Sequence, residues 1–164
     1  MITSKKIVLL GHFGVGKSSI VRQFITNEFS TDYKVTIGVH ILKKEISLKS
    51  GGICSLIIWD LEGTDNIDLV NTSYLLGTDS FIYVYDVTRP ITYVNLEENV
   101  NKLKLMFSNS LIKVVGNKVD LFDAEEREAY EKLMGSKQYL GSAKTGENIN
   151  TIFLDIAKEL ILEE

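Results

Sequence analysis

The sequence predicts a doubly wound α/β domain with a six-stranded, mostly parallel sheet, one antiparallel edge strand and helices on both faces. Apolar runs alternate with helical patterns along the chain, which is typical of repeated βα units. Four of the predicted strands are near-continuous hydrophobic runs, as expected for strands that are covered on both faces. The 164 residues are 45% apolar and 24% charged, which suits a single domain over residues 1–164.

The first half of the chain begins with the apolar strand Lys6–Leu10, and a glycine-rich turn then leads into a helix over Lys17–Thr26. Val39–Leu48 mixes apolar positions with three adjacent charged residues, which is typical of a partly exposed edge strand. A turn at residues 50–52 joins it to the apolar strand Ser55–Asp60. We therefore expect these two strands to form an antiparallel hairpin.

The segment Asp65–Leu75 is expected to be a helix, although its Asn, Thr and Ser residues have poor helix propensity. In Asn148–Leu162, apolar residues recur at helical spacing, which predicts a helix with one buried face. The other expected helices are Tyr93–Phe107 and Ala124–Leu133. The other expected strands are Phe81–Asp86, Leu111–Gly116 and Gln138–Leu140. In such a sheet, right-handed crossovers place ligands at the carboxyl ends of the strands.

Composition and charge argue against several classes of function. The formal net charge is −4 and no five like charges are adjacent, so nucleic acid is not expected as a partner. Cys54 is the only cysteine, which fits a reducing compartment, and no signal peptide precedes the first strand. No apolar stretch has the length of a membrane span, and no prenylation cysteine or myristoylation glycine is present. We expect a cytoplasmic protein without a direct lipid anchor.

The turn between the first strand and the first helix has the spacing G-x-x-x-x-G-K-[ST] and runs from Gly11 to Ser18. Its glycines allow several backbone N–H groups to face one anion, and the helix that follows presents its positive end there. Lys17 is expected to reach terminal phosphates, and the Ser18 hydroxyl to hold Mg²⁺. The predicted phosphate-binding residues are Gly14, Val15, Gly16, Lys17, Ser18, Ser19 and Gly63.

Other polar motifs lie where predicted strands end. Asp60 ends the third strand and is well placed to hold Mg²⁺, and the Gly63 N–H can meet a γ-phosphate without a side chain in the way. Asp120, in Asn117-Lys118-Val119-Asp120, can accept two hydrogen bonds from the adjacent N–H and NH₂ groups that guanine has and adenine lacks. The aliphatic stem of Lys118 can lie over the base. The Ala143 N–H can donate to the guanine carbonyl oxygen, while Ser142 supports the loop that ends at Lys144.

Together these motifs resemble the five-part nucleotide site of the small GTPases of the Ras superfamily, most closely Rab-type or Ras-type members, over essentially all 164 residues. The resemblance implies the P-loop NTPase fold, Mg²⁺, GTP and GDP as ligands, and effector or regulatory proteins as partners. Residues 35–39 resemble the family's first switch, which implies that Thr36 joins Ser18 and Asp60 as a metal ligand when a γ-phosphate is present. Tyr33 is similar to a tyrosine that closes over the phosphates. The guanine-binding residues implied are Phe29, Asn117, Lys118, Asp120, Ser142, Ala143 and Lys144.

The chain departs from this family in its second switch, which usually has the pattern D-x-A-G-Q-E and here spans residues 60–65. Here Thr64 replaces the glutamine that orients the attacking water, and Glu62 adds negative charge near the terminal phosphate. Phe13 is large where the family usually has a small residue. The catalytic residues implied are Lys17, Thr36, Glu62, Gly63 and Thr64.

These departures allow several hypotheses about the function and about the residue that orients water. The protein is either a switch that hydrolyses GTP slowly or a long-lived GTP-bound interaction module. Glu62 or Asp65 is a candidate to replace the missing glutamine, since a carboxylate can accept a proton from water. Arg22 and Arg89 are weaker candidates for stabilising charge, and surface positions fit them better. An adenine-nucleotide phosphotransferase is a third alternative, against which Asp120 argues.

Overall fold

The computed structural model describes residues 2–32, 34–49, 51–135 and 138–162. Its strands are β1 (Ile2–Gly11), β2 (Val39–Ser47), β3 (Ile53–Leu61), β4 (Ser80–Asp86), β5 (Leu111–Asn117) and β6 (Tyr139–Leu140). Its α-helices are α1 (Lys17–Thr26), α2 (Thr72–Leu75), α3 (Leu96–Met106), α4 (Ala124–Met134) and α5 (Ile149–Leu162). The short 3₁₀ turns are η1 (Ile67–Leu69), η2 (Pro90–Thr92) and η3 (Val119–Leu121).

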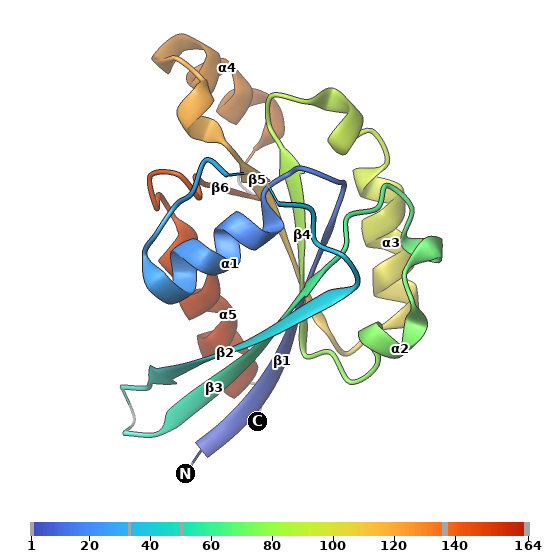
Figure 1. Ribbon diagram of the computed structural model, residues 1–164, viewed down its shortest axis with the longest axis vertical. Helices are drawn as coiled ribbons and strands as arrows, with labels where there is room; N and C mark the ends of the chain where they lie inside the picture. Colours follow the sequence, from blue (N-terminus) through green and yellow to red (C-terminus); the bar gives the residue numbers. More distant parts are fainter. Residues whose placement is uncertain (1, 33, 50, 136–137, 163–164) are drawn as a thin grey trace.

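The six strands form one sheet in the order β2-β3-β1-β4-β5-β6. The edge strand β2 runs antiparallel to β3, and the other neighbouring pairs are parallel. This confirms the predicted mostly parallel sheet with an antiparallel edge strand. Because the parallel strands point the same way, their carboxyl ends meet at one edge, shown at the top of the sheet in Figure 1.

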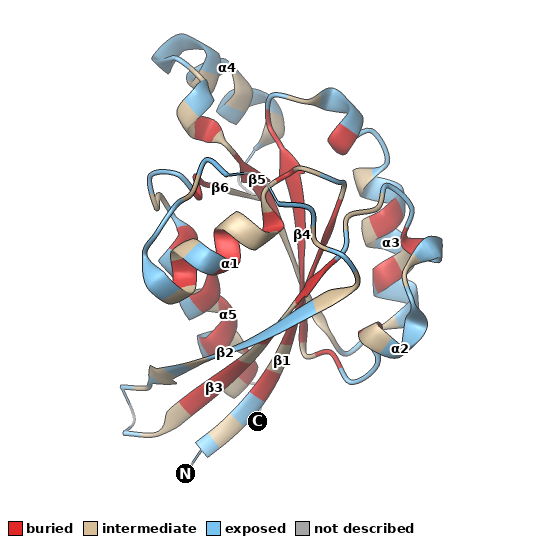
Figure 2. Ribbon diagram, viewed as in Figure 1, coloured by how far each residue is buried: buried red, intermediate tan, exposed pale blue. Residues whose placement is uncertain are grey.

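Helices cover both faces of the sheet, as predicted, and the buried residues in Figure 2 follow the strands between them. The helices α1 and α5 lie on one face, where Phe24 and Phe153 stack with ring centroids 4.0 Å apart. The helices α2 and α3 lie on the other face, over Val8, Phe81 and Tyr83. None of the described helices is long and apolar enough to cross a bilayer.

The predicted helix Asp65–Leu75 is wrong, because the chain there forms only η1 and the four-residue α2. The Asn66 side chain accepts a hydrogen bond from the Asp68 N–H at 2.9 Å, and the Asn71 side chain accepts one from the Ser73 N–H at 3.0 Å. Each asparagine therefore begins a new turn instead of continuing a helix. The helix predicted from Tyr93 also begins later, at Leu96, because η2 precedes it.

Candidate nucleotide-binding site

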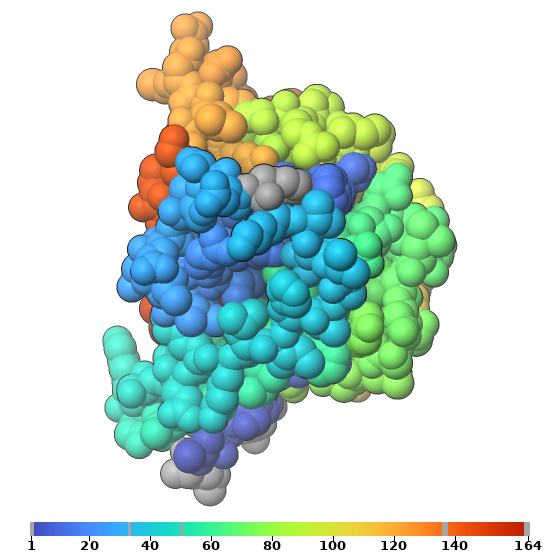
Figure 3. Space-filling model, viewed as in Figure 1, coloured from blue at the N-terminus to red at the C-terminus, as the bar shows by residue number. Residues whose placement is uncertain are grey.

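A pocket of about 480 Å³ opens at the carboxyl ends of β1, β3 and β5, beside the start of α1. The segment between α1 and β2 passes across its front (Figure 3). The predicted site residues that line it are Gly14, Gly16, Lys17, Ser18, Ser19, Phe29, Thr36, Gly63, Asn117, Lys118, Asp120, Ala143 and Lys144. Among the described residues, the predicted site residues that do not line it are Val15, Asp60, Glu62, Thr64 and Ser142. Tyr33 lies outside the described residues.

The glycine-rich loop turns tightly because Gly16 has a left-handed φ of 100°. A Cβ at this position would collide with the amide nitrogen of Asn117. That amide donates to the Val15 carbonyl at 2.9 Å, and its oxygen accepts a hydrogen bond from the Ala143 N–H at 3.0 Å. Asn117 therefore joins the loop after β1 to the loop after β6. The Ala143 N–H, which we expected to face the base, is here bonded to this amide.

Lys17 lies at the bottom of the loop and is only 6% exposed. Its Nζ donates to the Gly11 carbonyl at 2.9 Å and to the His12 carbonyl at 3.1 Å. Burial lowers the pKa of Lys17 to about 8, and the negative charge of Asp60 partly opposes this effect. An incoming phosphate would favour the charged lysine and raise its pKa again.

The lowered pKa of Lys17 predicts that nucleotide binding weakens above pH 8. The free protein would then have to take up a proton in order to bind phosphates with a charged lysine. We expect GDP affinity to fall about fourfold between pH 7 and pH 8.5, and Lys17→Met to bind weakly without this slope. Fluorescence competition across this pH range measures both. A wild-type GDP affinity that stays constant to pH 8.5 would contradict the role of Lys17, with its lowered pKa, in binding the phosphates.

Three oxygen-bearing side chains meet beside Lys17. The Ser18 Oγ lies 2.7 Å from the Thr36 Oγ1 and donates to the Asp60 Oδ2. Burial raises the pKa of Asp60, while the hydrogen bond from Ser18 and the charge of Lys17 act in the opposite direction. Within the part of the chain that the structure describes, the other carboxylate oxygen of Asp60 is buried without a hydrogen-bond partner.

This arrangement fits a small hard cation. Hydroxyl and carboxylate oxygens are the ligands that Mg²⁺ prefers, and a cation would satisfy the buried Asp60 Oδ1. The described residues contain no group of three or more His, Cys, Asp or Glu side chains suited to a metal ion. Phosphate oxygens and waters would therefore complete the octahedral shell, which is how Mg²⁺ is usually held in nucleotide sites.

The far end of the pocket is held by Asp120 and Ser142. The buried Ser142 hydroxyl donates to the Asp120 Oδ1 at 2.6 Å and accepts a hydrogen bond from the Thr145 N–H at 3.1 Å. Ser142 thus supports the carboxylate and the loop without lining the pocket. The Asp120 carboxylate does line the pocket, next to Ala143 and Lys144. This end therefore offers a fixed acceptor for a base.

Lys118 is held by an acid to which sequence reasoning gave no role. Its Nζ donates to the Gly14 carbonyl at 2.9 Å and lies 2.8 Å from the Asp86 Oδ2. Asp86 is 1% exposed, and burial alone would raise its pKa, but hydrogen bonds from Lys118 and Thr88 lower the pKa overall. Asp86 ends β4. A carboxylate at the end of a buried strand was the only signal in the sequence.

A family model described as the Ras family matches residues 6–162. The chain belongs to the Ras family. It is 33% identical over 165 residues to Ras-related protein Rab-21 of Dictyostelium discoideum, covering 97% of this chain and 77% of the relative. It is 33% identical over 164 residues to Rab-21 of Mus musculus, covering 96% and 73%. It is also 33% identical over 168 residues to Rab-18-B of Danio rerio, covering 98% and 81%.

The resemblance noted in the sequence is thus confirmed, together with the P-loop GTPase fold. As a Rab/Ras-like member, the protein is a GTP-binding switch of the GTPase class. Proteins of this family in general bind GTP, GDP and Mg²⁺ and interact with effector or regulatory proteins.

In this Ras-family protein, the second switch lies against the phosphate loop. A Cβ on Gly63 would lie 2.5 Å from the Cα of Phe13, so the two backbones touch. The Thr64 N–H donates to the Gly11 carbonyl at 3.0 Å. The Thr64 hydroxyl donates to the Asn66 carbonyl at 3.1 Å and accepts from the Asn66 N–H at 3.2 Å. Its hydroxyl is therefore used in its own turn.

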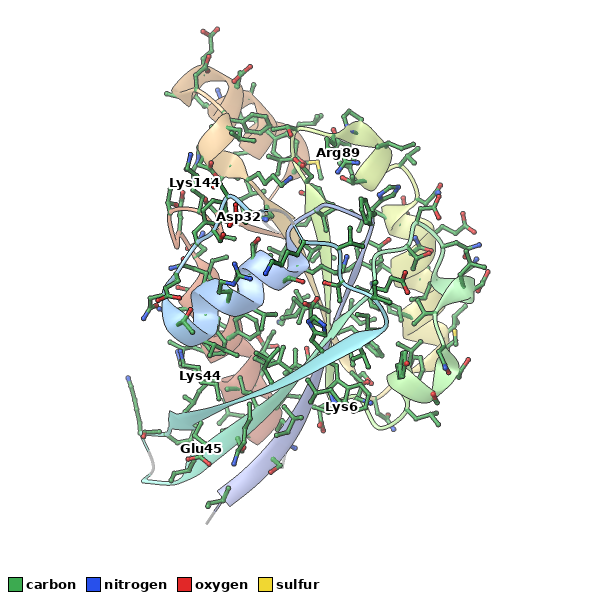
Figure 4. The ribbon with its side chains drawn as sticks, viewed as in Figure 1. Lys6, Asp32, Lys44, Glu45, Arg89 and Lys144 are labelled. Atoms are coloured by element: carbon green, nitrogen blue, oxygen red, sulfur yellow. The ribbon has the colours of Figure 1, made fainter. Side chains whose placement is uncertain are left out.

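The two candidate arginines of this Ras-family protein occupy different places. Arg22 lines the pocket from α1, on an exposed position. Arg89 donates from Nη1 to the Phe13 carbonyl at 3.2 Å, at the outer side of the phosphate loop. Figure 4 shows Arg89, Asp32 and Lys144 at the end of the molecule that holds the pocket, and Lys6 and Glu45 toward the other end.

Proposed function

We propose that this Ras-family protein is a Mg²⁺-dependent GTP-binding switch whose own hydrolysis of GTP to GDP is slow. The observation that carries the Mg²⁺ dependence is the meeting of Ser18, Thr36 and Asp60 around a buried, unpartnered carboxylate oxygen. When bound there, Mg²⁺ would neutralise charge on the β- and γ-phosphates. Thr36 belongs to the segment between α1 and β2. Because contacts to Mg²⁺ and a γ-phosphate would order this segment, the position of Thr36 would depend on whether a γ-phosphate is present.

The remaining roles follow the geometry of the pocket. Lys17 and the backbone of residues 14–19 bind phosphates in this proposal, and Gly63 meets the γ-phosphate. Asp120 reads the guanine edge, Lys118 and Phe29 contact the base, and Asn117 and Ser142 hold the loops. We also propose that residues 1–164 act as one nucleotide-binding domain in the cytoplasm.

Slow hydrolysis is supported by the second switch. The Thr64 hydroxyl is bonded to Asn66, and the side chains of Glu62 and Asp65 do not line the pocket among the described residues. Asp65 instead lines a separate hollow beside α3. No side chain of this segment is thus placed to orient an attacking water, and the γ-phosphate would persist.

The absence of a water-orienting side chain among the described residues of the second switch also favours a second candidate function, a GTP-bound interaction module that barely hydrolyses its nucleotide. Exposed apolar side chains lie in the first switch and on the elements that follow the two switches: Ile37 is 79% exposed, Ile41 in β2 is 53% exposed and Leu76 after α2 is 60% exposed. In either function we propose that this surface binds an effector or regulatory protein.

Single-turnover hydrolysis of preloaded GTP with Mg²⁺ tests the proposal. We expect the wild type to be slow and Thr64→Gln to be faster by roughly tenfold or more, because a carboxamide can bridge water and γ-phosphate. Thr26→Gln, on the exposed end of α1, is the matched control and should change nothing.

Three outcomes are informative. Rapid wild-type turnover that Thr64→Gln leaves unchanged would contradict slow hydrolysis and direct attention to Glu62 and Asp65. Freshly purified protein that carries mostly GTP would favour the interaction module, and mostly GDP the slow switch. Competition by ATP as strong as by GTP would contradict the guanine assignment.

A further inference from the structure

Asn99 of α3 places a polar side chain in the core beneath the second switch. It is 3% exposed, and the apolar cluster on this face contains Tyr83 of β4 and Leu103, which follows Asn99 by four residues on α3. Its Nδ2 donates to the Asp65 carbonyl at 3.2 Å and to the Tyr83 hydroxyl at 2.9 Å. Its Oδ1 accepts a hydrogen bond from the Ile67 N–H at 3.4 Å.

The partners of this amide identify what it does. Burying an amide is unfavourable unless its hydrogen bonds are made, and an apolar side chain would fill the same space without that cost. Two of these three bonds go to the backbone of residues 65–67, and none of the three goes to α3 itself. Asn99 therefore links the second switch by hydrogen bonds to α3, a helix that does not line the nucleotide pocket.

Residues 65–67, which Asn99 holds, directly follow the residues that lie beside the phosphate loop. The Thr64 N–H is bonded to the Gly11 carbonyl, and Gly63 touches the backbone of Phe13. Lys102, one turn after Asn99, adds an exposed ion pair to Asp68 at 2.8 Å, which contributes little by itself. The chain from Gly63 to Ile67 is thus held between the phosphate loop and α3 by atoms of the protein.

Apolar packing holds this segment only at one point. Ile67 is 5% exposed and packs into the core, whereas Leu69 is 74% exposed. A hollow of about 260 Å³ separates the segment from α3, and its lining includes Asp65, Asn66 and Asn99 itself. The hydrogen bonds of Asn99 to the Asp65 carbonyl and the Ile67 N–H link α3 to this segment beside the hollow.

We propose that Asn99 is a positioning residue that orders residues 63–67 before a γ-phosphate arrives and so raises the affinity for GTP relative to GDP. This inference rests on the proposed function. When a loop becomes ordered on binding, the lost conformational entropy weakens the affinity. A loop that is already ordered loses less entropy, so the ligand binds more tightly. GDP has no γ-phosphate for Gly63 to meet, so its affinity depends little on this order. Thr36 remains the part of the site that senses the nucleotide.

The test is the ratio of affinities for a non-hydrolysable GTP analogue and GDP, measured with Mg²⁺ for wild type, Asn99→Leu and Asn101→Leu. Asn101 is exposed on the same helix and serves as the matched control. We expect Asn99→Leu to lower the ratio about tenfold through the GTP analogue alone, and Asn101→Leu to leave it unchanged.

An affinity ratio that Asn99→Leu leaves unchanged would overturn the inference, whether both affinities fall equally or neither falls. A purely structural role would change both affinities together. A wild-type protein that binds neither nucleotide would instead overturn the proposed function. Hydrogen exchange of the wild type keeps the inference testable if Asn99→Leu does not fold. The Thr64 and Ile67 amides should be protected in the GDP-bound form, and protection that appears only with the GTP analogue would overturn it.

Discussion

Replacing Asp120 with asparagine is expected to lower GDP affinity by at least about a hundredfold and to raise affinity for the xanthine nucleotide. The carboxylate can accept hydrogen bonds from the adjacent N–H and NH₂ groups of guanine, whereas an amide turns one acceptor into a donor that faces a donor. Xanthine has a carbonyl oxygen where guanine has its NH₂ group, so the new donor gains a partner. The Ser142 hydroxyl can still donate to the amide oxygen, which preserves the loop.

Competition binding with GDP, the xanthine nucleotide and ADP measures this change of preference. Asp155→Asn is the control, because Asp155 lies on α5, where it accepts a hydrogen bond from Tyr139 and does not line the pocket. An Asp120→Asn protein that keeps full GDP affinity would show that another group reads the base. One that loses all nucleotides equally would indicate damage to the loop instead of a change in specificity.

The parts of the site that the sequence predicts are those fixed by short spacing or by strand ends. The phosphate loop is a local spacing, so Gly16, Lys17 and Ser18 are placed by a few bonds of chain. Asp60 lies near the end of β3 and Asp120 follows β5, two strands whose carboxyl ends meet at one edge of the sheet. A parallel sheet is enough to bring these motifs to one end of the molecule, and the alternation of apolar runs predicts such a sheet.

The parts that the sequence does not predict depend on contacts between distant residues. The amide of Asn117 turns toward Val15 and Ala143, and nothing local distinguishes that from an amide facing a base. Asp86 gains its role only because β4 lies beside β5, which carries Lys118 at its end. The helix expected over residues 65–75 is broken because Asn66 and Asn71 bond to the backbone just after them, a competition that apolar spacing does not reveal.

Removing Mg²⁺ with a chelator is expected to speed GDP release from the wild type by about a hundredfold, and Ser18→Ala should release GDP fast with or without chelator. Without the Ser18 hydroxyl, Asp60 keeps its buried carboxylate but loses the donor that now partners its Oδ2. The cation would then keep fewer oxygen ligands from the protein, and the phosphates would be held mainly by Lys17 and the loop backbone.

Ser19→Ala is a matched control for this effect, because Ser19 follows Ser18 and its predicted contribution to phosphate binding comes through a backbone N–H that alanine retains. It should keep both slow release and full sensitivity to the chelator. Release rates from fluorescent GDP, measured across a Mg²⁺ titration, separate the two serines. A wild-type rate that ignores the chelator would mean that the buried Asp60 Oδ1 has another partner, and Ser18, Thr36 and Asp60 would then serve only to hold the first switch closed.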